Sequence, residues 1–433
     1  MNGDRGSGSL TAKNMVVGFD LGKYSVQISY FRGGMDKPQT AEVVTGSEIY
    51  NVPMVLCKRR GVNQWFYGRD AIRYHENGDG IMVDNLLQKA VDKETGNIDG
   101  MEVDGIALLT LFIKRSLSIL GGAGTGRVSD IMFTCEDLGS DVIDVMSRVT
   151  EGLKLRNCSV YFQNYAESIY HYMIHQDETI WKGDVLCSHY DGMKLTNYVF
   201  RRNLRTMPIV TLVDVGDKID MPFPQIVTEE ARAAAYDRLG RQFLDEVSGL
   251  LDAGDFSGIY LLGDGFKDEW YGSCVRSLAG NRRIFLGNDM FSRGACHCLI
   301  DKYENGDEPP KHIYLGADKL RSNVGMNVLR RGTESYLALL DAGVNWYELK
   351  SEHELFLPED HVLRFVIIPL DGGVHEVREI ELQGVPERDE DTLRVKLSIR
   401  MSDLNTVQLH VEDVGFGELF PSTGKTWDLT MEL

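Results

Sequence analysis

The chain has 433 residues, of which 43% are hydrophobic and 26% charged, a composition typical of ordinary folded proteins. That length exceeds what one compact core accommodates, so we expect about two to four subdomains. With 46 basic and 65 acidic residues the net charge is −19, which argues against nucleic acid and anionic membrane as partners.

No apolar run of about 18 residues is present to insert into a membrane, and residues 1–10 are rich in Gly and Ser rather than signal-like. We therefore expect a cytoplasmic protein. Its seven cysteines are scattered, which favours reduced, buried thiols over a disulfide framework. Cys296-His297-Cys298 lacks the spacing of a zinc site, so structural thiols are expected there as well.

The first part of the chain is predicted to be a disordered tail at residues 1–13 followed by strands and two helices. The expected strands are 15–20, 25–32, 39–45 and 52–58, and the expected helices are 68–74 and 104–120. The glycine-rich run 121–126 lacks the Lys-Ser or Lys-Thr of a phosphate loop, so we interpret it as a helix terminator.

The first two strands form a hairpin whose tip combines a carboxylate, a glycine and small polar groups: Asp20, Gly22, Lys23 and Ser25. Backbone N–H groups at such a tip can point at a phosphate, while the Asp20 carboxylate holds a hydrated magnesium ion. Taken alone, the pattern is more often a simple hairpin, so a phosphate site there requires matching motifs further along the chain.

Strands and helices alternate over the next 150 residues, which indicates a layered α/β domain. The expected strands are 129–135, 158–163, 184–189, 195–201, 207–213 and 258–262, and the expected helices are 140–154, 164–175, 228–251 and 267–279.

The remainder, 312–433, has short strands with turn residues between them, which predicts an all-β sandwich after a domain spanning 14–311. Its expected strands are 324–330, 335–340, 354–357, 361–368, 375–382, 392–399 and 406–412. Trp346 and Tyr347 either face a partner or cover the core, and we favour the second role.

In order, these pieces resemble the actin-like ATPase fold, which is α/β, ribonuclease-H-like and built of two lobes, and within it the DnaK-type seventy-kilodalton heat-shock chaperones. The motifs that resemble the family are the first phosphate loop 17–25, the segment 52–71, the connecting helix 157–172, the adenosine motif 228–265, the second connecting helix 287–295 and two sandwich motifs, 323–326 and 379–386.

The resemblance implies a cleft for ATP or ADP with magnesium, and a sandwich that binds a protein or peptide. The candidate nucleotide-binding residues are Asp20, Gly22, Lys23, Ser25, Asp191, Gly192, Gly263, Gly265 and Lys267, with Asp20 also the candidate magnesium ligand.

Several residues depart from the family pattern. The leading aspartate of the second phosphate loop aligns with Ser188, and Tyr190 takes a glycine position where backbone should approach phosphate. The connecting-helix glutamate aligns with Tyr165, and the water-orienting lysine aligns near Leu86, with Lys89 a possible stand-in. Phosphoryl transfer depends on positioning and charge neutralisation, so we expect weak or absent hydrolysis.

The leading hypothesis is thus a chaperone-like or scaffold protein with a degenerate nucleotide domain, a pseudo-ATPase, and a lidless partner-binding sandwich. The alternative is a reduced but active ATPase, in which Asp20, Asp191 and Glu167 converge on one metal ion. A filament-forming relative is disfavoured, because only residues 200–228 remain where the family has a whole subdomain. The oligomeric state stays open.

Overall fold

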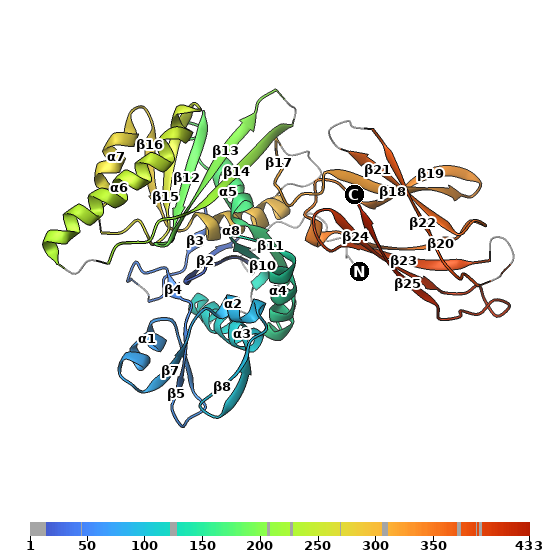
Figure 1. The fold of residues 1–433 in the computed structure, drawn as a ribbon, viewed down its shortest axis with the longest axis horizontal. Coiled ribbons are helices and arrows are strands. Elements are labelled where there is room, and N and C mark those ends of the chain that lie inside the picture. The colour runs from blue at the N-terminus through green and yellow to red at the C-terminus, as the bar shows by residue number, and fades with distance from the viewer. Residues whose placement is uncertain are drawn as a thin grey trace. The chain divides into compact units, whose positions relative to one another are not determined.

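The computed structural model describes residues 14–433 apart from short gaps at 45, 122–127, 206–207, 226–227, 269, 305–310, 370–373, 387 and 389–391. The tail expected at 1–13 and most of the glycine-rich run therefore lie outside the described residues. The chain divides into two compact units, Met1–Tyr314 and Leu315–Leu433 (Figure 1). The boundary expected after residue 311 precedes this division by three residues.

The first sheet of unit 1 is built from a hairpin and two parallel strands. Its strand order is β11-β10-β1-β2-β3, with β4 (Val52–Pro53) also paired to β2. The strands are β1 (Met15–Leu21), β2 (Ser25–Arg32), β3 (Gln39–Thr40), β10 (Val128–Cys135) and β11 (Ser159–Asn164). β2 runs antiparallel to β1 and β3, whereas β1, β10 and β11 are parallel to one another.

The second sheet repeats this arrangement. Its order is β16-β15-β12-β13-β14-β17, and the strands are β12 (Asp184–Tyr190), β13 (Lys194–Asn203), β14 (Ile209–Asp220), β15 (Phe256–Leu262), β16 (Arg283–Gly287) and β17 (His312–Tyr314). β13 is antiparallel to β12 and β14, and β12, β15 and β16 are parallel. If β4 and β17 are left aside, the other five strands of each sheet, numbered in chain order, are arranged as 3-2-1-4-5 with the same directions.

Two helices link the sheets, because each follows one sheet and packs on the other. α5 (Tyr165–Ile174) begins after β11 of the first sheet, where the Asn164 side chain caps it, yet its buried residues pack against β12, β13 and β15. α8 (Met290–Glu304) begins after β16 of the second sheet, yet it packs on β1 and β10 of the first.

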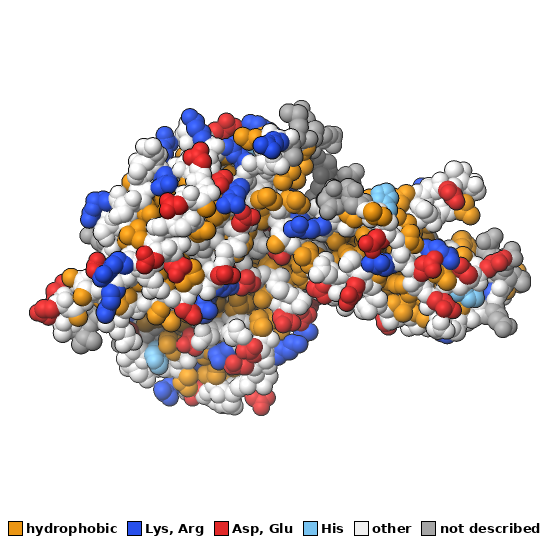
Figure 2. Space-filling model, turned by 45° about the horizontal axis from the view of Figure 1, so that its top comes forward, with side chains coloured by type: hydrophobic (Ala, Val, Ile, Leu, Met, Phe, Trp, Pro, Cys, Tyr) orange, Lys and Arg blue, Asp and Glu red, His pale blue; other side chains and the backbone are white. Residues whose placement is uncertain are grey.

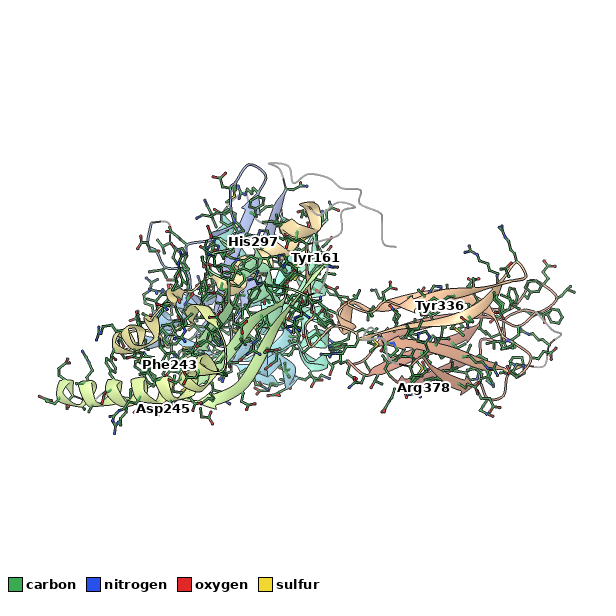
Figure 3. All side chains as sticks on the ribbon, turned by 90° about the horizontal axis from the view of Figure 1, so that it is seen from above. Tyr161, Phe243, Asp245, His297, Tyr336 and Arg378 are labelled. Carbon is green, nitrogen blue, oxygen red and sulfur yellow. The ribbon has the colours of Figure 1, made fainter. Side chains whose placement is uncertain are left out.

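The opposite face of the second sheet is covered by α6 (Glu229–Asp252) and α7 (Gly272–Ala279). Two residues of α6, both labelled in Figure 3, show its two faces: Phe243 is fully buried against the sheet, and Asp245 is exposed. Apolar residues at helical spacing thus give α6 one buried stripe, as its sequence predicts.

Smaller elements complete unit 1 between β4 and β11. They are β5 (Leu56–Arg59), β6 (Trp65–Tyr67), α1 (Gly68–Glu76), β7 (Gly80–Val83), α2 (Leu86–Val91), β8 (Thr95–Ile98), β9 (Met101–Asp104), α3 (Gly105–Ser116), the 3₁₀ turn Leu117–Leu120 and α4 (Ser140–Leu153). β5, β6 and β7 form one small sheet, and β8 and β9 form a hairpin.

Unit 2 has two four-stranded antiparallel sheets, with orders β19-β18-β21-β22 and β20-β23-β24-β25. Their strands are β18 (Ser322–Arg330), β19 (Thr333–Leu340), β20 (Lys350–Phe356), β21 (Val362–Pro369), β22 (Glu376–Glu381), β23 (Arg394–Met401), β24 (Thr406–Asp413) and β25 (Thr426–Glu432). Tyr336 on β19 and Arg378 on β22, labelled in Figure 3, mark the two edge strands of the first of these sheets.

Most expected elements are present, with some corrections. The strand expected at 39–45 is paired only at Gln39–Thr40, and the helix expected at 267–279 begins at Gly272. Trp346 is buried, so it covers the core rather than facing a partner, and Tyr347 is half-buried.

No helix among the described residues is long and apolar enough to cross a membrane. Acidic and basic side chains alternate over the face shown in Figure 2, without a large area of either charge.

Candidate functional site

A cavity of about 390 Å³ lies in unit 1 where the tips of the two sheet hairpins meet. The β1–β2 turn contributes Gly22 to Ser25, and the β12–β13 turn contributes Asp191. Further walls come from α2, from the residues after β10 and β15, and from the N-terminal ends of α5 and α8. Since both sheets have the same strand order, two equivalent hairpins face one space.

Strand registers identify which residues of the two hairpins are equivalent. Leu21 pairs with Val26 and closes a four-residue turn, and Tyr190 pairs with Leu195 and closes another. One residue earlier, Asp20 of the first hairpin corresponds to His189 of the second. The expected alignment of Ser188 with that position is therefore wrong by one residue, because the turn length determines the register.

Asp20 is a buried carboxylate at the floor of the cavity. The Tyr165 hydroxyl donates a hydrogen bond of 2.7 Å to its Oδ1. Burial raises the pKa of Asp20 to about 7, with the Tyr165 hydrogen bond opposing and the nearby Asp264 charge adding to the rise. Tyr165 also stacks on Phe291 with ring centroids 3.7 Å apart. Tyr165, the residue that the sequence resemblance aligns with a glutamate, therefore contacts Asp20 through a hydroxyl.

In the second turn, between β12 and β13, backbone N–H groups are hydrogen-bonded to a side chain of the same turn. Oδ1 of Asp191 accepts hydrogen bonds from the backbone N–H groups of Met193 and Lys194, each at 2.7 Å. A phosphate bound by this turn would need the same N–H donors. The Asp191 carboxylate therefore already satisfies the N–H groups that a phosphate at this turn would use.

Tyr190 does not obstruct the cavity, contrary to the expectation from its glycine-like position. Its ring is fully buried on the opposite face of the second sheet, edge-on to Phe266 and Trp270. A Cβ on Gly265 would lie 2.3 Å from that ring. Gly265 is thus required by Tyr190 packing and is not a residue of the cavity wall.

The cavity brings together six of the nine candidate residues: Asp20, Gly22, Lys23, Ser25, Asp191 and Gly263. Gly192, Gly265 and Lys267 lie outside its wall. The exposed Lys267 ammonium lies over the Phe223 ring, 4.6 Å from its centroid. Lys267 is close to Gly263 in the sequence, but it does not line the cavity.

The proposed stand-ins are also outside the wall. Lys89 pairs with Glu94 at 2.8 Å on the far side of α2 from the wall residues Leu87, Gln88 and Val91. Glu167 is buried but does not line the cavity, so it does not join Asp20 and Asp191 there.

Sequence reasoning missed a chain of polar side chains across the cavity. Asn51 Nδ2 donates to Asp264 Oδ1 at 2.5 Å, and Gln27 Nε2 donates to Asn51 Oδ1. Ser25 Oγ lies 3.5 Å from Asp264 Oδ2. The hairpin register alone places Gln27 opposite Asp20, so that part was available as a signal.

A second group of polar side chains, also not predicted from the sequence, connects the two sheets through Lys218 of β14. Its ammonium pairs with Glu136 at 3.2 Å and with Asp137, and Thr196 Oγ1 donates to Glu136 at 3.0 Å. Lys218 is therefore neutralised by residues of the cavity wall and is not available to a bound anion.

Magnesium would have one protein carboxylate at the floor, Asp20, while the equivalent position is His189, whose pKa is lowered by burial. The described residues contain no group of three or more His, Cys, Asp or Glu side chains arranged to hold a metal ion. The wall has further carboxylates, Glu136, Asp137, Asp191 and Asp264, but among the described residues they do not gather into such a group.

Comparison with protein families gives two matches that follow the two units. Residues 319–433 match a domain of unknown function, DUF8552. No curated protein matches the sequence. Residues 37–317 match the C-terminal part of a family of unknown function, DUF5716, and because this covers most of the chain, the protein belongs to that family.

Proposed function

We propose that the protein is a chaperone-like or scaffold protein in which a catalytically inactive, actin-like domain is joined to a partner-binding β-sandwich. The observation behind this proposal is the Asp191 carboxylate, which satisfies the backbone donors of the second hairpin turn within a cavity formed by both hairpins.

The repeated 3-2-1-4-5 strand order supports two ribonuclease-H-like lobes. In such a pair the cleft lies between the lobes, and α5 and α8 each cross from one lobe to the other. A ligand in the cleft would shift the equilibrium between two arrangements of the lobes only by the difference between its binding free energies for the two arrangements.

Three features of the cleft argue against ATP hydrolysis. The second turn has its own carboxylate in place of a phosphate, Lys218 is neutralised, and the position equivalent to Asp20 is His189. Positioned charge of this kind supplies most of the rate in phosphoryl transfer, so its loss leaves little catalysis. The alternative of a reduced active ATPase requires a convergence of Asp20, Asp191 and Glu167 that the cavity wall does not have.

The sandwich offers edges to which an extended peptide can add a strand. β22 pairs with β21 only among the described strands, and Val377 on it and Val374 just before it are 55% and 85% exposed. Exposed valines beside an unpaired edge fit apolar peptide side chains.

An aggregation assay tests the proposal. The full-length protein is expected to slow light-scattering growth of a heat-unfolding client enzyme, equally with and without Mg-ATP. Changing Val374 and Val377 to Lys should reduce the effect about twofold or more, because charge at an edge opposes strand addition.

The matched control changes Val44 and Val62 of unit 1 to Lys, at positions 61% and 48% exposed, and should leave the effect unchanged. Equal aggregation with and without the protein would refute the chaperone-like role. A requirement for Mg-ATP would instead favour the active ATPase.

A further inference from the structure

A cluster of three histidines and one aspartate lies between the linking helices α5 and α8, outside the cavity wall. His171 Nδ1 and His175 Nε2, both on α5, lie 2.8 Å from the two carboxylate oxygens of Asp301 on α8. A carboxylate only accepts, so both ring nitrogens donate to it. Burial alone would raise the pKa of Asp301, but these two hydrogen bonds outweigh burial and hold it well below its usual range.

His297 of α8, labelled in Figure 3, is the member of the cluster that has no room for a charge. Its ring stacks on His175 with centroids 4.1 Å apart, and its buried Nδ1 has no hydrogen-bond partner among the described residues. A proton on His297 would therefore place a buried charge without an acceptor beside a second imidazole. Burial, together with His175 and Arg293, lowers the pKa of His297 to about 3, although Asp301 opposes the shift.

His171 has the opposite preference. Burial alone would lower its pKa, but the Cys298 sulfur and the Asp301 carboxylate outweigh burial and raise the pKa of His171 to about 10. Two histidines of one helix pair are thus held in different states, one neutral and one charged. Further titratable or charged groups beside the cluster are Tyr170 of α5, Arg293 of α8 and Tyr314 of β17, which stacks on Tyr170.

We propose that this cluster is a pH-sensitive clamp between α5 and α8, which weakens when His297 must gain a proton and also when His171 must lose one. In an opened junction both imidazoles would titrate near their ordinary value of about 6.5. Acid then favours the open form through His297, from about pH 6.5 down to about 3, and alkali favours it through His171, from about pH 6.5 up to about 10. The clamp is tightest near pH 6.5, because the two contributions balance there.

Opening of this clamp reaches the cavity through the same two helices. At the cavity, Tyr165 of α5 stacks on Phe291 of α8, and both line the wall. Between that stack and the cluster, a Cβ on Gly294 would lie 2.0 Å from the backbone oxygen of Ser168, so the helix backbones touch. A backbone contact cannot be compressed, so the helices pivot there and the Tyr165 stack changes when the clamp opens. This mechanism is independent of the proposed function, since it requires neither a client protein nor a nucleotide.

Hydrogen exchange of the whole protein, followed by mass spectrometry, tests the proposal at about pH 4.5, 6.5 and 8.5. After correction for the intrinsic exchange rate, peptides from α5 and α8 should exchange at least about tenfold faster at the two outer pH values than at the middle one. Peptides from α6, which has no part in the cluster, should exchange equally at all three.

Three variants separate the two sides of this pH profile. His297→Phe keeps a ring against His175 but cannot accept a proton, so the increase in acid should disappear and the increase in alkali should remain. His171→Gln keeps a donor for Asp301 but does not titrate, so it should lose the increase in alkali only. His75→Phe, at an exposed position of α1, is the matched control and should keep both. Circular dichroism at the middle pH establishes that each variant is folded.

Equal exchange of α5 and α8 at the three pH values would overturn the proposal, and so would an increase in acid that His297→Phe leaves unchanged. Faster exchange of α6 in parallel with α5 and α8 would also overturn it, because general unfolding rather than an opened junction would then explain the profile. The aggregation assay does not measure this exchange, so failure of the clamp and failure of the proposed function are distinguishable.

Discussion

Replacing Gly294 by Ala is expected to lower the free energy of unfolding of unit 1 by about 3 kcal/mol. A Cβ at position 294 of α8 would lie 2.0 Å from the backbone oxygen of Ser168 in α5. Backbone cannot rotate away as a side chain can, so the two linking helices must separate to accommodate one methyl group. Scanning calorimetry should show the unit 1 transition several degrees lower.

Gly249→Ala is the matched control, because Gly249 lies in the exposed face of α6 and a Cβ there meets nothing within 4 Å. The same substitution should stabilise unit 1 by about 0.5–1 kcal/mol, since Ala restricts the unfolded chain and favours helix. Equal transition temperatures for Gly294→Ala and the unchanged protein would show that α5 and α8 do not approach this closely.

The second large effect is expected in unit 2, where Asp413→Ala should cost about 3–5 kcal/mol. Asp413 is fully buried, and its carboxylate accepts from the Arg388 guanidinium and from both the backbone N–H and the hydroxyl of Thr423. Burial alone would raise the pKa of Asp413, but these hydrogen bonds outweigh burial and lower it. Without the carboxylate, Arg388 remains as an uncompensated buried charge.

Asp428→Ala provides the comparison within the same unit. Asp428 pairs with His410 at 2.7 Å, but its side chain is 81% exposed, so little stability should be lost. Urea denaturation followed by tryptophan fluorescence measures both variants. Similar midpoints for Asp413→Ala and Asp428→Ala would contradict the role assigned to the buried pair.

Periodicity is sufficient to predict most of the helices and strands, and it fails where tertiary contacts decide. It predicts a helix over residues 267–271, but Trp270 packs edge-on against Tyr190 and its indole N–H donates to the Gly265 oxygen. The expected strands omit β25. Trp427 and Met431 are nevertheless buried and lie four residues apart, on the same face of the strand, which is the pattern of a strand with one exposed face.

The predicted residues that line the site are those of its hairpin tips and Gly263. Asp20, Gly22 and Asp191 are local features of turns, so the sequence places them without knowledge of the remaining fold. The partners Tyr165, Asn51 and Asp264 come from distant segments that meet through tertiary packing. The alignment that selected Ser188 over His189 relied on motif similarity, whereas the hairpin register depends on turn length.

Steady-state phosphate release from Mg-ATP measures most directly whether the cleft hydrolyses nucleotide. Purified protein is expected to release phosphate no faster than the buffer, and Asp20→Ala should behave identically. Release above background that disappears in Asp20→Ala would refute the proposed loss of catalysis, because it would place a working phosphoryl-transfer site at the first hairpin.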